Sequence, residues 1–157
     1  MSLNPEIADF FKRQNIAIAS TIDKQGNIHC AIKEVVGVKP DGDLLLFDLY
    51  CNRTYENLKN DPRISVTALS EKEFKGYTIQ GKARIIPRSE VNDEIISERE
   101  KKIVQRISAR LISSVKSDLK SRAHFEAELP AMPKYLIEVS VDKVVDLSPP
   151  KFEKDCL

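Results

Sequence analysis

One segment constrains the fold more than any other part of the chain: LLLFDLYCNRTYENLKNDP, residues 44–62. It predicts a short buried strand, a polar turn and then a helix that ends before Pro62, because the residue before a proline avoids helical geometry. Either Asn52 or Thr54 can act as the N-cap of this helix. The helix dipole favours an anion at that end, where Arg53 offers a charged partner. The segment therefore indicates a phosphate-binding turn or, alternatively, a capped surface helix whose arginine points to water.

Strand-like runs with clear turn signals flank this segment. The runs on its N-terminal side are residues 16–22 and 28–38, which the turn DKQGN joins into a hairpin. Side chains alternate along the second run, so its even-numbered residues are expected to face one way and its odd-numbered residues the other. The runs on the C-terminal side are residues 63–69 and 76–86, in which Gly81 predicts a bulge or a bend.

Helical signals lie on both sides of this array. Asn4 and Pro5 predict a cap and a first turn for a helix that ends near residue 13. From residue 89 to about 125, apolar residues recur mostly at four-residue steps, which is typical of an amphipathic helix or a helical pair. Acidic side chains interleave with its basic ones and indicate a solvated surface. One or two strands follow in YLIEVSVDKVVDL, so the chain as a whole predicts a mainly β fold, a small barrel with peripheral helices.

Length and charge limit the classes of function. With 157 residues, the chain is expected to form a single domain over residues 1–157. Lysine and arginine number 25 against 24 acidic residues, so no charge excess favours a nucleic acid or an anionic membrane as partner. The chain has neither a transmembrane-length apolar run nor the apolar core of a signal peptide, and we expect a cytoplasmic protein. Its scattered cysteines and histidines predict neither a disulfide framework nor a metal site.

Residues 17–86 resemble the flavin-binding split-barrel proteins related to pyridoxamine 5'-phosphate oxidase. The likeness lies in an ordered set of segments: ASTIDKQGNIH, LLLFD, NRTYENLKNDPRISV and KGYTIQGKARII. Its most specific part is the motif R-T-x-x-N-L-x-x-D-P, followed by K-G-Y-x-I-x-G at the observed separation. The resemblance implies a split β-barrel that pairs side by side with a second copy as a homodimer, with FMN in each of two grooves between the chains.

The resemblance also implies which residues bind FMN. In the family, the turn after the third strand presents basic and hydroxyl side chains to the phosphate; here these positions are Arg53 and Thr54, with Asn52 beside them. The residues just before the turn, Phe47 and Asp48, correspond to those that lie along the ribityl chain and the ring edge. Most of the expected site therefore comes from the segment that constrains the fold.

The remaining part of the expected site comes from the second strand. In the family its end runs under the isoalloxazine ring, and this stretch maps to Ala31, Ile32 and Lys33 to within one or two residues. Lys33 would then contact the phosphate or the negative N1 of the reduced ring. The alternative for Lys33 is a lysine on the wet face of a strand.

Other positions depart from the full oxidases. Those enzymes carry an arginine in the second-strand segment, where AIKEVV offers only Lys33, and a second basic residue where this chain has Thr54. A glutamine that touches the flavin in those enzymes aligns with Gly76, and their C-terminal substrate-binding Arg and His pattern is replaced by SPPKFEKDCL. We therefore expect a flavin site without pyridoxamine phosphate oxidation.

The expected function is that of an FMN-binding flavoprotein, an oxidoreductase or electron carrier for a small substrate. His29, Asp48 and Tyr77 are the nearest acid–base candidates, but such residues are more often structural, so no catalytic residue is assigned. The alternatives are a non-catalytic module that stores or senses flavin, a dimeric scaffold without flavin, and a deazaflavin site. Haem is disfavoured, because only His29 lies near the expected groove as an axial ligand.

Overall fold

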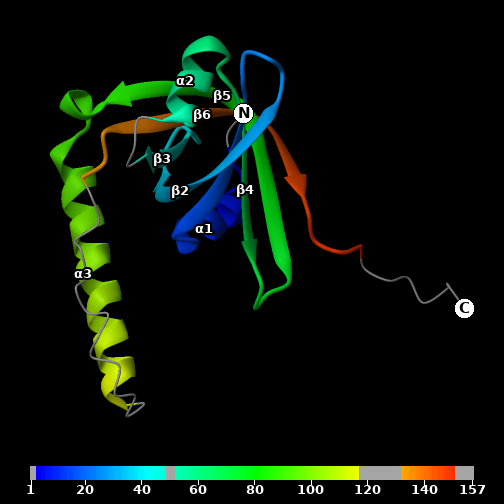
Figure 1. Ribbon diagram of the computed structural model, residues 1–157. Coiled ribbons are helices and arrows are strands. Elements are labelled where there is room, and N and C mark those ends of the chain that lie inside the picture. The colour runs from blue at the N-terminus through cyan, green and yellow to red at the C-terminus, as the bar shows by residue number, and fades with distance from the viewer. Residues whose placement is uncertain (1–2, 49–51, 117–131, 151–157) are drawn as a thin grey trace, which may run out of the picture.

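The computed structural model describes residues 3–48, 52–116 and 132–150, without the side chains at 110, 111 and 113–116. Within these ranges, six antiparallel strands close into a barrel in the order β1-β2-β3-β6-β5-β4 (Figure 1). The strands are β1 (Ile16–Ile22), β2 (Ile28–Val38), β3 (Leu44–Asp48), β4 (Arg63–Ser70), β5 (Lys75–Pro87) and β6 (Tyr135–Asp146). Around them lie the helices α1 (Pro5–Arg13), α2 (Arg53–Asn60) and α3 (Asp93–Lys116). The predicted mainly β fold with peripheral helices is thus confirmed.

Most element boundaries agree with the prediction. β1 and β2 have the predicted bounds, and in the first half of β2 the even-numbered side chains are exposed while the odd-numbered ones are more buried. β4 and β5 extend slightly beyond the predicted runs, and the C-terminal run forms the single strand β6. In α1, the Asn4 side chain accepts a hydrogen bond from the Glu6 backbone N–H at 2.9 Å, which confirms the predicted cap.

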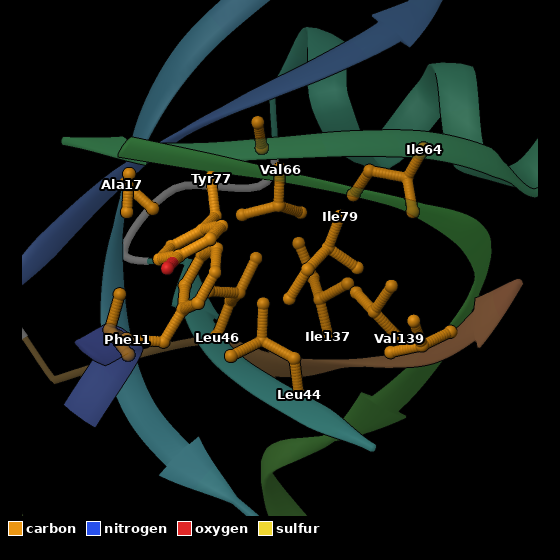
Figure 2. Close-up of a cluster of buried hydrophobic side chains, with 14 of the residues drawn as sticks. Phe11, Ala17, Leu44, Leu46, Ile64, Val66, Tyr77, Ile79, Ile137 and Val139 are labelled. Atoms are coloured by element: carbon orange, nitrogen blue, oxygen red, sulfur yellow. The ribbon is translucent and has the colours of Figure 1, made fainter. Parts of the chain in front are cut away.

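Strand β3 is buried along its whole length, as its unbroken apolar sequence predicts. Leu44 and Leu46 point into the barrel and pack among the side chains of the surrounding strands (Figure 2). The alternate residues Leu45 and Phe47 face outward. They pack in a second apolar cluster with residues of β5, β6, the segment that leads into α3 and the first turn of α3, namely Ile86, Leu136, Val91 and Ile96. The helical segment therefore covers the outer face of a strand whose inner face fills the barrel.

The R-T-x-x-N-L-x-x-D-P motif serves largely to attach α2 to the barrel. The buried Asn57 donates a hydrogen bond from its side-chain amide to Thr21 Oγ1 on β1 at 3.0 Å, and Leu58 joins the barrel core. After the helix, hydrogen bonds from the side chain and the backbone of Arg63 lower the pKa of Asp61 from 3.8 to about 2. These hydrogen bonds need the ionised Asp61 carboxylate. Their contribution to stability is therefore fully present above pH 3.8, the ordinary pKa of this group, and is lost as the pH falls through about 2. The contacts of Asn57 and Leu58 hold the second half of α2 on the barrel.

Helix α3 stands beside the barrel, and its C-terminal part runs past it (Figure 1). The helix begins at Asp93 rather than near residue 89, because residues 88–90 form a short 3-10 helix and the Asn92 side chain accepts a hydrogen bond from the Glu94 N–H at 2.9 Å. The remainder of the predicted helical segment, residues 117–125, lies outside the described residues. In the part of the chain that is described, no helix is long and apolar enough to cross a membrane.

The predicted irregularity at Gly81 is a bulge in β5. Pairing between β5 and β6 shifts register between Gln80 and Gly81. The two strands approach so closely here that a Cβ added at Gly81 would lie 1.9 Å from the backbone carbonyl oxygen of Ser140. Glycine is therefore required at this position by close contact of two backbones.

We expect Gly81→Ala to lower the free energy of unfolding by about 3 kcal/mol or more, at the upper end of overpacking costs, because a backbone segment must move. Gly37→Ala is the matched control, since a Cβ at this β2 glycine meets nothing within 4 Å. Urea unfolding measures both variants. Equal unfolding midpoints for the two would contradict the role assigned to Gly81.

Candidate functional site

The residues predicted to bind the cofactor gather around one hollow. It lies over β2 and β3, beside the start of α2, and has a cavity volume of about 710 Å³. This volume is in the range of small-molecule and cofactor sites. All of the predicted residues line it: Ala31, Ile32 and Lys33 from β2, Phe47 and Asp48 from β3, and Asn52, Arg53 and Thr54 at the start of α2.

The start of α2 lacks a side-chain cap. Asn52 takes the N-cap position, but its side chain makes no capping hydrogen bond. Thr54, the other predicted cap, lies inside the helix and is 2% exposed. Asn52 is therefore the N-cap residue, one of the two predicted, but no side chain that the structure describes caps the helix. A helix start without a cap leaves backbone N–H groups for an anion, and here that start lines the hollow.

Arg53 is the first residue of α2 and is exposed on the wall of the hollow. It forms no ion pair with another residue that the structure describes, unlike Arg63, Arg84 and Arg99. Its guanidinium group can therefore make a bidentate contact with a phosphate or a carboxylate.

A row of buried polar side chains crosses three neighbouring strands at the hollow. Lys33 Nζ on β2 lies 2.7 Å from Asp48 Oδ2 on β3, and the Tyr135 hydroxyl on β6 donates a hydrogen bond to the same oxygen. Asp48 and Tyr135 are partners in the β3–β6 register. Lys33 is 7% exposed, which contradicts the alternative of a lysine on a wet strand face. The row places a fixed ammonium group at the hollow.

This row also contacts the helix that carries Arg53. The Tyr135 ring packs against Tyr55 of α2 with 5.1 Å between ring centroids. Tyr135 therefore connects the Lys33–Asp48 pair to the first turn of α2. A change in the pair is expected to affect the position of this turn.

The acid–base candidates separate into two locations. His29 is half-buried on β2 and lines the hollow together with Asp48. Tyr77 lies in the barrel core, where it packs edge-to-face on Phe10 with 5.1 Å between ring centroids, and does not line the hollow. The described residues contain no cluster of side chains that could hold a metal ion.

Sequence reasoning missed the wall that α3 contributes to the hollow. Ile103 and Arg106 of α3 line it. The Arg99 side chain, 4% exposed, donates a hydrogen bond from Nε to Glu34 Oε2 on β2 at 2.9 Å, and its guanidinium group lies 5.7 Å from the centre of the Phe47 ring. The apolar spacing of the helix does not tell which strands it covers. A charged residue such as Glu34 next to the apolar residues of β2 is the sequence signal that a basic side chain from another element packs there.

The Lys33–Asp48 pair is expected to be critical for stability. Lys33→Met or Asp48→Leu alone should lower the free energy of unfolding by about 3–5 kcal/mol, because each leaves a buried charge without this partner. The double variant should recover much of that loss. Urea unfolding of the four proteins gives the double-mutant cycle. Losses that simply add would contradict a direct interaction between the two side chains.

Comparisons with known proteins agree with this architecture. The sequence matches the family described as pyridoxamine 5'-phosphate oxidase over residues 3–134. A search of curated proteins gives no match.

Several solved structures share the fold. HupZ from Group A Streptococcus aligns with a TM-score of 0.62 and 18% identity, over 93% of this chain and 94% of that chain. A putative pyridoxamine 5'-phosphate oxidase from Lactobacillus delbrueckii gives 0.58 and 16%, over 92% and 93%. HutZ, the haem storage protein from Vibrio cholerae, gives 0.57 and 19%, over 92% and 94%. At these identities the likeness shows the fold alone, and it confirms the split-barrel type. Because the family match spans most of the sequence, the chain belongs to the pyridoxamine 5'-phosphate oxidase family.

Proposed function

We propose that this protein is a cytoplasmic, FMN-binding flavoprotein that acts as an oxidoreductase or electron carrier for a small substrate. The observation that carries the proposal is Arg53, which has no ion-pair partner among the described residues and lies at the uncapped start of α2. This arginine lines a hollow of about 710 Å³. Together these features supply the charge, the backbone donors and the space that a phosphorylated planar cofactor requires.

In this proposal Arg53, Thr54 and the first backbone N–H groups of α2 bind the phosphate, with Asn52 beside them. By the family resemblance, Phe47 and Asp48 would flank the ribityl chain and the ring edge, and the β2 residues 31–33 would lie next to the ring. FMN would supply the redox chemistry when bound. The chain would hold the phosphate and place a positive charge at the hollow through Lys33, whose ammonium group is held by Asp48.

We also propose that the protein is a homodimer. The outward face of the β1–β2 hairpin exposes four isoleucines, which are 40% to 73% exposed: Ile16, Ile18, Ile28 and Ile32. Ile18 and Ile32 are direct cross-strand partners, and this isoleucine patch continues along the strands to Ile16 and, beyond Cys30, to Ile28. An apolar patch of this kind is typical of an interface between proteins. Ile16 and Ile32 also line the hollow, so a second copy seated on the patch would close the hollow on that side.

Haem, which the sequence disfavours because His29 is the one axial ligand near the expected groove, is a second candidate because the structure places this histidine on the wall of the hollow. This half-buried histidine lines the hollow, where its imidazole could act as an axial ligand. HutZ of Vibrio cholerae, which shares the fold, is a haem storage protein. A Soret band on titration with haem that is lost in His29→Ala would support this ligand over FMN.

Arg53→Ala should weaken FMN binding by about 1.5–3 kcal/mol, the range for a charge-assisted hydrogen bond. The melting temperature should change little, because the side chain is exposed. Lys59→Ala is the matched control, since it removes an exposed positive charge from the same helix outside the hollow. Titration followed by FMN fluorescence measures the affinity. An unchanged affinity in the Arg53 variant would remove this residue from the site.

Ile18→Glu should convert the dimer to a monomer at roughly micromolar concentration, because it places a charge in the isoleucine patch. Phe74→Glu introduces the same charge at a side chain that is 75% exposed in the β4–β5 turn, and it should leave the dimer intact. Sedimentation velocity distinguishes the two species. A wild-type protein that sediments as a monomer at this concentration would refute the dimer.

A further inference from the structure

The α3 wall of the hollow carries an excess of positive charge. Glu34 is shared by Arg99, at 2.9 Å, and Arg106, whose Nη2 lies 3.6 Å from the other carboxylate oxygen. The second distance is longer than a charge-assisted hydrogen bond. The other contact of Arg106 is a long hydrogen bond from Nε to the Lys102 carbonyl oxygen, at 3.4 Å. One carboxylate thus serves two guanidinium groups, and Arg106, whose side chain is 36% exposed, is the one able to bind a further anion.

Arg106 approaches the hollow from a different side than Arg53. Phe47 belongs to the apolar cluster on the outer face of β3, which the segment leading into α3 covers. The adjacent Asp48 points to the opposite face of the strand, where it pairs with Lys33 and where Tyr135 packs against α2. Arg53 begins the helix that packs against this inward-facing row, whereas Arg106 contacts Glu34, the cross-strand partner of the outward-facing Phe47. The two arginines thus belong to different elements of the wall, and each can contact an anionic group of its own.

We propose that Arg106 binds the carboxylate or phosphate ester of a second small molecule, the substrate of the proposed flavoprotein. Ile103, one turn earlier on α3, lines the same wall and is 9% exposed. The subsite therefore combines a guanidinium group with an apolar surface, which fits a small acid with an apolar or planar body. The inference rests on the proposed function for the identity of the first ligand, and on the contacts of Arg106 for the charge of the second.

The test uses the full chain loaded with FMN and three probes: benzoate, phenyl phosphate and the neutral benzamide. Isothermal titration calorimetry measures the affinity of each probe. We expect the wild-type protein to bind both anions more tightly than benzamide, and Arg106→Gln to weaken both anions by about tenfold or more. Lys101→Gln removes an exposed charge from α3 outside the hollow and should change neither affinity. Arg106→Lys should retain part of the affinity, because lysine keeps the charge without the bidentate geometry.

Three results would overturn the proposal: equal anion affinity in Arg106→Gln and the wild type, benzamide binding as tight as benzoate, or a loss of FMN in Arg106→Gln as large as that in Arg53→Ala. The last result would place both arginines on one phosphate. FMN retention is measured first, by absorbance, so a wild-type protein that retains no FMN refutes the proposed function separately. Titration of the same anions into flavin-free Arg53→Ala protein then measures whether Arg106 binds them without FMN and without Arg53.

Discussion

Burial of β3 on both faces is the constraint on which the rest of the structure depends. Its inner face fills the barrel, so its outer face needs a second layer, and the segment that leads into α3 supplies it. The ion pair between Arg99 and Glu34 then ties α3 to β2. A helix packed there also forms a wall of the hollow, through Ile103 and Arg106. The shape and charge of the site therefore follow from how one barrel strand is covered.

The end of β3 shows how the same strand serves packing and chemistry. Asp48 continues the inward-facing positions, yet it pairs with Lys33 and Tyr135 where an apolar residue would suffice for packing. Removing two charges from water is costly, and the pair offsets this cost only with good geometry and further hydrogen bonds. We interpret its presence at the hollow as a way to hold an ammonium group in one position. The proposal for FMN depends on these side chains, because the fold alone does not determine function.

The features that the sequence predicts well depend on local backbone chemistry. The Asn4 cap, the strand boundaries and the Gly81 bulge each follow from residues within one turn or one hairpin. The predicted site residues also line one hollow, and much of the motif around them proves to hold α2 in place. Contacts between distant segments could not be predicted in the same way. Glu34 and Arg99 are 65 positions apart, and helical periodicity does not reveal which strand a helix will cover.

The visible absorption spectrum of the purified protein, recorded after FMN is added and the sample is desalted, tests the central claim most directly. If the hollow binds FMN, the absorption bands of oxidised flavin will remain with the protein and will bleach when dithionite is added. They will be much weaker in Arg53→Ala treated in the same way. A wild-type protein that is colourless after desalting would contradict the account and leave the hollow to another ligand.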